Sequence, residues 1–425
     1  MRMIGRKSTA CRILMVFAVV FSSVLAQGAK VQLVHFTYSG HGERWQAWLG
    51  AIAKDFEAAT GIGVRVEVSM SSGDYQPKLL TMVAGGVAPD VTDAHPMLAA
   101  PFIAQDIFED LGPYIKRDKV PLERIPPAIV RGVQTPDGVM WGLPVSVYPV
   151  VTFFNADMFA EAGIANPIQL GENWTWETAT TSAQRLTVDA DRDGVPERYG
   201  LNAISARYEQ QVHQAGGTLY DRLVYPTNSR FNTPPVQTAL QWIQSLYVDR
   251  LASTSGNVQV YRGNAAFSVT EGPGFISAYY QDVPFSWDIA VQPKGPANRA
   301  ARVNPDGFQI LAASQHKDAA WKWIHFLTTS VDNQLELVRY TSRMPALREA
   351  MLRYPKVSTG KQPDNWYALV DTAFDPDGYA AYVIPNATVI DPVVNAVLNR
   401  IWRGEIAVAT ALEQIDQQVN ALLRP

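Results

Sequence analysis

Residues 141–164 read WGLPVSVYPVVTFFNADMFAEAGI, and they carry both the pattern of a buried strand and that of a helix start. The first half is apolar at most positions, with Pro144 setting the backbone and Val145 among the valines that fill the interior, which is typical of a strand in a sheet core. Asn155 then fits the N-cap of a helix, and Asp157 falls in its first turn, where the helix dipole favours a carboxylate. The stretch therefore predicts a buried strand that leads into a helix.

Length and composition indicate a globular chain of two domains. The chain has 425 residues, of which 47% are apolar and 18% are charged, and this length exceeds what one ordinary core supports. The formal net charge is −4, and it includes four basic residues in the first twelve positions, Arg2, Arg6, Lys7 and Arg12. Without these four positive charges the net charge is about −8, which argues against a nucleic acid or an anionic membrane as partner.

Residues 1–26 have the three parts of a secretory signal peptide: a basic start, an apolar run over 13–25 and the small-residue cleavage site VLA at 24–26. The apolar run is too short to span a bilayer comfortably, so we predict cleavage on export to the periplasm, with an uncleaved anchor as the alternative. Cys11 is the only cysteine, and it precedes the apolar run, whereas a lipoprotein cysteine follows it. The mature chain is therefore expected to have no thiol, disulfide or lipid anchor.

The first part of the mature chain alternates strands and helices. Strands are predicted at 31–38, 64–68 and 90–93, and helices at 43–60 and 74–84. This order predicts a mainly parallel sheet with helices on both faces, in which ligands bind beyond the carboxyl ends of the strands. The loops of interest are therefore 38–44, 69–75 and 93–97.

The remaining chain continues the alternation of helices and strands. Helices are predicted at 176–186, 235–247 and 319–329, strands at 264–270 and 288–293, and two further helices in 392–423, divided by Gly404. The segment after 288–293 would return the chain to the first domain, and the last two helices would belong to the second. The sequence EGPG at 271–274 predicts a turn that places Phe275 at its exit.

The stretch 141–164 resembles the segment of the family 1 extracellular solute-binding proteins in which the chain leaves one lobe and enters the other. The matching positions are Gly142, Leu143, Pro144, Phe154, Asn155, Asp157, Phe159, Ala162 and Gly163. Other family-like stretches follow in order along most of the mature chain, at 175–177, 185–187, 199–200, 216–217, 263–266 and 319–326. The resemblance implies an α/β, two-lobed periplasmic binding protein fold (type II), in which each lobe is a mainly parallel sheet flanked by helices and the ligand cleft lies at the hinge.

The same resemblance implies which residues form each lobe and what the protein does. The N-terminal lobe would comprise 27–142 plus 300–345, and the C-terminal lobe 146–298 plus 350–425. The protein would be similar to the maltose-binding type, would bind a carbohydrate in the cleft and would deliver it to the membrane permease subunits of an ABC importer, with polyols or glycerol phosphates as alternative ligands. We expect a monomer that makes and breaks no covalent bond.

A carbohydrate cleft requires aromatic rings for the apolar faces of the sugar and short polar side chains for its hydroxyl groups. Tryptophans on the predicted helical faces, such as Trp48 and Trp321, are expected in the core. The aromatic candidates in loops or near the crossover are Tyr38, Trp45, Tyr148, Tyr208, Phe275 and Trp287. The polar candidates are His41, Glu43, Asp93, His95, Glu271 and Arg343, of which Arg343 offers a fork for hydroxyl groups or a carboxylate.

The sequence DADRDGVPE at 189–197 has the alternating carboxylates and the glycine of a calcium-binding EF-hand loop. The twelfth position of such a loop, which should supply a glutamate, is Gly200, so Glu197 would have to replace it. We predict either a structural calcium ion or a set of Asx-turns without metal. The calcium ligands would be Asp189, Asp191, Asp193 and Glu197, and no other cofactor is expected.

The rival function is that of a secreted glycoside hydrolase, which needs two carboxyl groups about 5 Å apart for a retaining mechanism and further apart for an inverting one. Glu43 and Glu271 are the pair that could serve. The sequence lacks a nucleophile elbow, a zinc-binding His-Glu-x-x-His and a phosphate-binding loop. It also lacks the repeats of a surface adhesin, so binding without catalysis is the favoured function.

Overall fold

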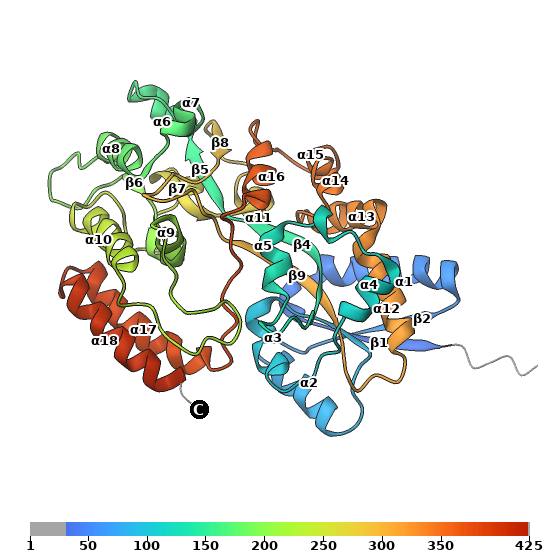
Figure 1. Cartoon of the computed structure of the whole chain (residues 1–425). Helices are drawn as coiled ribbons and strands as arrows, with labels where there is room; N and C mark the ends of the chain where they lie inside the picture. The colour runs from blue at the N-terminus through green and yellow to red at the C-terminus, as the bar shows by residue number, and fades with distance from the viewer. Residues whose placement is uncertain (1–30, 424–425) are drawn as a thin grey trace, which may run out of the picture. The chain divides into compact units, whose positions relative to one another are not determined.

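The computed structural model describes residues 31–423, and the predicted signal peptide at 1–26 lies outside the described residues. Two sheets flanked by helices form the described chain, as predicted (Figure 1). The strands are β1 (Gln32–Thr37), β2 (Gly63–Val68), β3 (Val91–Asp93), β4 (Leu143–Pro149), β5 (Val151–Asn155), β6 (Tyr199–Leu201), β7 (Ala265–Glu271), β8 (Trp287–Ala290) and β9 (Val303–Ile310).

The helices surround these strands in the order in which they follow along the chain. The α-helices are α1 (Glu43–Thr60), α2 (Tyr75–Ala84), α3 (Pro96–Ile103), α4 (Gly112–Asp118), α5 (Pro127–Gly132), α6 (Ala156–Glu161), α7 (Pro167–Leu170), α8 (Trp176–Leu186), α9 (Tyr208–Gln214), α10 (Pro234–Val248), α11 (Pro273–Tyr279), α12 (Lys317–Thr329), α13 (Val331–Thr341), α14 (Arg348–Met351), α15 (Tyr354–Val357), α16 (Tyr367–Phe374), α17 (Ala387–Trp402) and α18 (Val408–Leu423). The 3₁₀ helices are η1 (Ser39–His41), η2 (Leu122–Arg124), η3 (Gly171–Asn173), η4 (Ile204–Arg207) and η5 (Val260–Arg262).

The first sheet has the order β2-β1-β3-β9-β4. Strand β1 pairs in parallel with both β2 and β3, which confirms the predicted alternation of strands and helices at the start of the mature chain. Strand β9 lies between β3 and β4 and is antiparallel to both. All strands of this sheet except β9 therefore run in the same direction.

The second sheet has the order β6-β7-β5-β8. Strands β6 and β7 are parallel, whereas β5 is antiparallel to its neighbours β7 and β8. Each sheet is thus mixed, with one reversed strand. The reversed strands, β5 and β9, are those on which the chain arrives from the other sheet, since β5 follows β4 and β9 follows β8.

The stretch that was predicted as one buried strand supplies a strand to each sheet. Strand β4 ends at Pro149, and β5 begins at Val151 in the other sheet, so only Val150 lies between them. The backbone N–H of Val150 donates to the oxygen of Arg302, in the segment that returns between the sheets, at 2.9 Å. The predicted helix start is confirmed, because the side chain of Asn155 accepts a hydrogen bond from the backbone of Met158 at 3.0 Å.

Helix α1 has the predicted bounds because its apolar residues recur every three or four positions. Trp45, Trp48 and Phe56 lie in the core of the first sheet. Gly42 precedes the helix with a φ of 86°, in the left-handed region that favours glycine. This turn joins η1 to α1 and places His41 beyond the carboxyl end of β1.

The turn predicted at 271–274 is instead the junction of a strand and a helix. Glu271 ends β7, Gly272 is the N-cap and Pro273 is the first residue of α11. Proline suits this position because its φ is already helical and the N–H that it lacks would have no partner in the helix. Phe275 therefore lies inside a helix.

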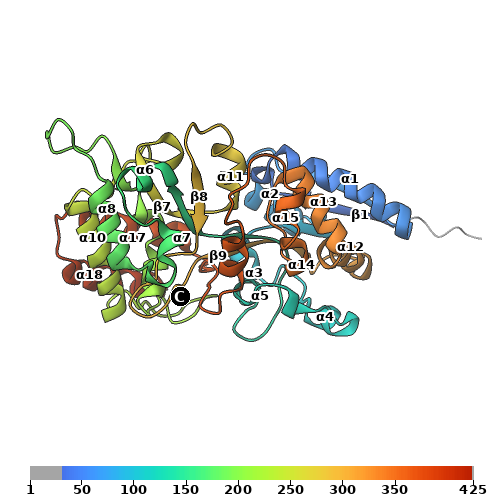
Figure 2. The same cartoon turned by 90° about the horizontal axis from the view of Figure 1, so that it is seen from above.

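The two helices predicted at the end of the chain are confirmed as α17 and α18. Gly404 follows α17 with a φ of 69°, and the buried residues Ile390, Ile401 and Ile415 pack in the core of the second sheet. Figure 1 and Figure 2 both show α17 and α18 side by side next to α10. Within residues 31–423, no helix combines the length and the apolar character needed to cross a membrane.

A third group of buried side chains surrounds the crossover strands. It contains Val147 of β4, Phe153 of β5, Trp287 of β8 and Val303 of β9, together with residues of α13 and α16 such as Leu335. The segments that connect the two sheets are therefore packed around an apolar core of their own.

Candidate functional site

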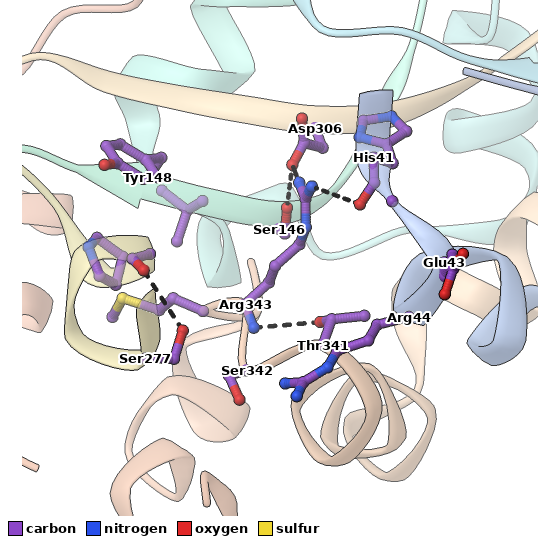
Figure 3. A pocket seen from close by; sticks show the side chains of 15 residues that line it. His41, Glu43, Arg44, Ser146, Tyr148, Ser277, Asp306, Thr341, Ser342 and Arg343 are labelled. Atoms are coloured by element: carbon purple, nitrogen blue, oxygen red, sulfur yellow. Dashed lines mark hydrogen bonds and ion pairs between the residues drawn. The ribbon is translucent and has the colours of Figure 1, made fainter. Parts of the chain in front are cut away.

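A cavity of about 500 Å³ lies between two strands of the first sheet and α11, the helix that follows β7 of the second sheet. Its walls come from the start of α1, from β4 and β9, from α11 and from the segment after α13 (Figure 3). Among the predicted residues, His41, Glu43, Tyr148 and Arg343 meet here. The other polar side chains that line the cavity are Arg44, Ser146, Ser277, Asp306, Thr341 and Ser342.

Arg343 reaches across the cavity wall toward Asp306 and His41 (Figure 3). Its guanidinium pairs with the carboxylate of Asp306, and Nη2 donates to the backbone oxygen of His41 at 3.4 Å. Ser146 Oγ donates to the same Asp306 carboxylate at 2.9 Å. Because the side chain of Arg343 remains 30% exposed and a guanidinium has five N–H donors, Arg343 keeps donors for a ligand.

Asp306 is the carboxylate that pairs with Arg343 in this cavity wall. Burial would raise the pKa of Asp306, but Arg343, His41 and His95 outweigh burial and hold it below its ordinary value. The carboxylate is therefore charged at neutral pH and can accept hydrogen bonds from hydroxyl groups.

Asp93, at the end of β3, lies fully buried among the residues that shape the cavity. It accepts hydrogen bonds from Thr37 Oγ1 at 2.5 Å, from the backbone N–H of Tyr38 at 2.8 Å and from Trp45 Nε1 at 2.9 Å. A side chain with no exposed surface does not touch a ligand in this conformation. Asp93 instead fixes the loop that carries Tyr38 and His41.

Two histidines flank the carboxylate of Asp93. His35 Nε2 lies 3.3 Å from one oxygen, and His41 Nε2 lies 3.4 Å from the other. His35 Nδ1 accepts from Trp323 Nε1 at 3.1 Å, so a neutral His35 carries its proton on Nε2, toward Asp93. Burial would raise the pKa of Asp93, but the charge and hydrogen bonds of these histidines hold it well below its ordinary value.

Trp45 lies beneath the cavity wall and does not line the cavity. Its ring stacks on His41 with 4.4 Å between centroids, and the guanidinium carbon of Arg343 lies 5.0 Å from its centroid. Phe308 stacks on it at 5.9 Å. Trp45, which was predicted to contact the sugar, therefore supports His41 and Arg343, two residues that do line the cavity.

Tyr148 is the aromatic residue of this cavity. Its ring packs so closely on the backbone before α11 that a Cβ at Gly272 would lie 2.4 Å from Cε1 of the ring. The glycine at this position thus allows the close approach of α11 to β4. Burial raises the pKa of Tyr148 to about 12 although Arg207 acts in the opposite direction, so the hydroxyl stays protonated and can donate a hydrogen bond.

A second cavity, of about 580 Å³, contains three more of the predicted residues, Tyr38, His95 and Tyr208. The ring of Tyr38 contacts both His41 of the first cavity, at 5.3 Å between centroids, and His95 of the second, at 6.1 Å. The two cavities are therefore neighbours. The other polar side chains of the second cavity are Gln76, Glu209, Tyr220, Arg302, Tyr382, Thr388, Asp391 and Asn395.

His95 offers this region one donor and one acceptor. Burial lowers the pKa of His95 below its ordinary value, and the nearby cations Arg302 and Arg343 add to this effect although Asp306 opposes it. The imidazole is therefore neutral at pH 7, which suits hydrogen bonding to hydroxyl groups.

Phe275, Trp287 and Glu271 line neither cavity. Trp287 is 6% exposed in the core around the crossover strands, and Phe275 packs on that core from α11. Glu271 is 1% exposed and accepts a hydrogen bond from Tyr280 Oη at 2.8 Å. Burial raises the pKa of Glu271 to about 7, and the hydrogen bond of Tyr280 opposes this shift.

Several residues that line the cavities carry no signal in the sequence. Asp306 lies in NPDG at 304–307, which is typical of a turn, yet pairing with β4 makes it part of β9. Ser277 and Glu209 lie on short helices that were not predicted. These residues share only their position near the crossover, and that position arises only when the chain folds.

The acidic loop at 189–197 brings three of its four predicted ligands together. One carboxylate oxygen from each of Asp189, Asp191 and Glu197 lies within 4.8 Å of the others. Asp193 is not in this group, and its carboxylate accepts a hydrogen bond from the backbone of Val195 at 2.7 Å. Carboxylate oxygens suit calcium, so the three residues fit part of the predicted site, and calcium binding stays a prediction.

Comparisons with known proteins identify what this arrangement is similar to. The sequence model described as "Bacterial extracellular solute-binding protein" matches residues 40–334. A Brucella abortus (strain 2308) protein, described only as a binding protein, is 23% identical over 424 residues, which cover 94% of this chain and 95% of its own.

Two solved structures have the same fold over nearly the whole chain. The ABC substrate-binding protein from Listeria monocytogenes, in complex with cycloalternan, has a TM-score of 0.73 at 23% identity and covers 93% of this chain and 99% of its own. The sugar-binding protein MalE from Xanthomonas citri has a TM-score of 0.77 at 21% identity, with 92% and 97% covered. At these identities the likeness establishes the fold.

Proposed function

Because this chain belongs to the bacterial extracellular solute-binding proteins, we propose that it captures a carbohydrate between its two sheets and delivers it to the membrane permease subunits of an ABC importer. The observation that carries the proposal is the pair of neighbouring cavities between strands β4 and β9 of the first sheet and helices α9 and α11, which follow strands of the second sheet. They combine the aromatic rings of Tyr38 and Tyr148 with hydroxyl, carboxylate and guanidinium groups. Apolar sugar faces and sugar hydroxyl groups need this mixture.

The likeness to sugar-binding proteins supports the carbohydrate. One similar structure is described in complex with cycloalternan, and another is described as a sugar-binding protein. Both extend over more than nine-tenths of this chain. A carbohydrate ligand agrees with the lining of the cavities, which offers both hydrogen-bond donors and acceptors.

Closure of two lobes about the crossover strands is the proposed mechanism. One lobe would contain the sheet β2-β1-β3-β9-β4 and the other the sheet β6-β7-β5-β8, with the hinge at the junctions of β4 with β5 and of β8 with β9. The boundary expected at 142–146 would then lie at Val150, because β4 pairs with β9 as far as Pro149. A ligand that binds the closed form more tightly shifts the population toward it, and only that form would dock productively on the permease. The protein would act as a monomer in the periplasm, after cleavage of its signal peptide.

We further propose that the protein does not hydrolyse its ligand. Glu43 is exposed at the start of α1 on the first cavity, whereas Glu271 is buried beside Tyr280. The pair considered for a hydrolase therefore does not face a common space. Asp306, the other carboxylate of the first cavity, is engaged by Arg343 and Ser146, as a binding group would be.

A thermal-shift screen followed by chromatography tests this function. The purified protein would be heated with neutral mono- and oligosaccharides, sugar acids, polyols and glycerol phosphates, because a ligand that binds only the folded state raises the melting temperature. We expect a rise with one class of carbohydrate or polyol, and recovery of that ligand intact. Recovery of cleaved sugar would establish a hydrolase instead, and no rise with any compound would contradict carbohydrate binding.

A further inference from the structure

Asp391 presents a carboxylate without a partner to the second cavity. It lies on α17 with exposed surface, and its side chain makes no hydrogen bond and no ion pair within residues 31–423. Partial burial raises the pKa of Asp391, and no cation of the described chain offsets this effect. The other two charged residues that line this cavity, Glu209 and Arg302, pair with each other at 2.9 Å. Since His95 is neutral at pH 7, the groups that line the second cavity carry a net negative charge.

Two further hydrogen-bond acceptors lie beside Asp391 on the same face of α17. Thr388 precedes it by three positions and Asn395 follows it by four, a spacing that aligns side chains along one face of a helix. Both line the second cavity with exposed surface, and neither side chain makes a hydrogen bond within the described chain. A protonated amine has three N–H donors and no acceptor, so this face of α17 offers the acceptors that such a group requires.

Tyrosine rings line the same cavity, namely those of Tyr38, Tyr208, Tyr220 and Tyr382. Burial raises the pKa of Tyr220, and the carboxylate of Asp391 adds to this effect, as expected for two groups that line one cavity. Tyr382 contacts Tyr220 edge to face, with 5.0 Å between the ring centroids. The faces of aromatic rings attract cations, whereas Asp391 would repel a carboxylate or a phosphate. The rings and the unpaired carboxylate therefore favour a cationic ligand group over an anionic one.

We propose that the ligand carries an ammonium group that binds to the carboxylate of Asp391, with the side-chain oxygens of Thr388 and Asn395 as further acceptors. This rests on the proposed function and narrows its ligand to an amino sugar or an aminated polyol. An ammonium donor makes a hydrogen bond to a carboxylate that is shorter and stronger than one between neutral groups. A neutral sugar can donate hydroxyl groups to Asp391, but it leaves the negative charge of the cavity without a partner.

Calorimetric titration of matched ligand pairs at pH 7 tests the proposal. The pairs are glucosamine with glucose, galactosamine with galactose, and the disaccharide of glucosamine with cellobiose, because an amino group with a pKa of about 7.7 is mostly protonated at this pH. We expect the amino member of at least one pair to bind at least about tenfold more tightly, as a hydrogen bond between charged groups implies. N-acetylglucosamine, whose amide nitrogen carries no charge, should show no such preference over glucose.

Variants of Asp391 connect this preference to the second cavity. Asp391→Asn should lose the preference and keep the affinity for the neutral member, whereas Asp391→Glu, which keeps the charge, should retain part of it. Glu413→Gln, which removes a carboxylate from an exposed position on α18, should keep the whole preference. Rising salt should reduce the preference, because ions screen a charge that remains exposed to solvent.

Two results would overturn the proposal: amino members that bind no better than the neutral ones, or an Asp391→Asn variant that weakens the binding of both members equally. Binding of neutral sugars alone would overturn only the ammonium group. Failure of every compound to bind, here and in the thermal-shift screen, would contradict the carbohydrate function as well.

Discussion

The guanidinium of Arg343 lies over the ring of Trp45, with 5.0 Å between its central carbon and the ring centroid. His41 covers the same indole, and the Trp45 N–H donates to Asp93. This aromatic residue therefore holds two polar residues of the first cavity in place. A ligand in that cavity would meet the supported groups, not the indole.

Replacing Tyr148 with alanine should weaken ligand binding. The ring is the aromatic surface of the first cavity, so its loss should cost about 1–3 kcal/mol of binding free energy where a sugar face packs on it. Calorimetric titration with the ligand found in the screen measures this loss, and Tyr148→Phe should restore most of the affinity.

Trp287→Ala is the matched control for Tyr148→Ala. Because Trp287 is buried in the core around the crossover strands, its loss should lower the free energy of unfolding by about 3–5 kcal/mol and leave the affinity of the folded protein unchanged. Unchanged affinity of Tyr148→Ala, or a large loss of affinity in Trp287→Ala, would place the ligand elsewhere.

Asp93→Asn should destabilise the protein in a pH-dependent manner. In the unfolded chain an aspartate titrates near pH 3.9, and in the folded protein the histidines hold the pKa of Asp93 well below that value. The stabilisation is therefore complete above about pH 5 and is lost as the pH falls further. Denaturant unfolding at pH 7 should show a loss of about 3 kcal/mol in the variant, because a buried charge network loses its anion.

The difference in free energy of unfolding between the wild type and Asp93→Asn should become smaller when the pH is lowered to 3.5. The exposed Asp282 offers a control, since Asp282→Asn removes a carboxylate without a buried network. A stability difference that stays constant from pH 7 to pH 3.5 would contradict the ionised state of Asp93 in the folded protein.

Glu271→Gln should have the opposite pH dependence. The folded pKa of about 7 lies above the unfolded value of about 4.3, so the folded wild type loses stability as the pH rises between these values. The loss is on the order of 3 kcal/mol and is complete above pH 7. The Glu271→Gln variant does not lose this stability, because its side chain stays neutral and can still accept a hydrogen bond from Tyr280.

We therefore expect the free energy of unfolding of Glu271→Gln, relative to that of the wild type, to be higher at pH 8 than at pH 5. Glu413→Gln, at an exposed position of α18, should show no such gain. An equal stability difference at both pH values would mean that Glu271 is already ionised at pH 5.

Calcium should raise the melting temperature, and the effect should depend on Asp191 but not on Asp193. Backbone N–H groups of the loop donate to both Asp191 and Asp193, but only Asp191 shares the group of carboxylate oxygens with Asp189 and Glu197. Asp191→Asn should abolish the calcium-induced shift, and Asp193→Asn should retain it. Equal shifts with calcium and with a chelator would show that the loop is a set of Asx-turns.

The sequence predicted much of the architecture because the signals are local. The apolar spacing of α1, the cap of α6 and the alternation of β1, β2 and β3 with helices depend on neighbours within a few residues. The junction of β4 and β5 was predicted as a single strand, because apolar residues fill both strands and only the pairing partners differ. Helix α13 was not predicted, although its end brings Arg343 to the cavity.

The sequence by itself determined the family resemblance, the alternating strands and helices and a set of loops near the ligand site. It placed Tyr38, His41, Tyr148 and Arg343 near the cleft, and the cavities contain them. Only the tertiary structure decided that Trp45 and Trp287 face inward, because the exposure of an aromatic ring depends on which distant chain covers it. It also decided the charges of the first cavity, since Arg343 and Asp306, which are far apart in the sequence, pair only in the folded chain.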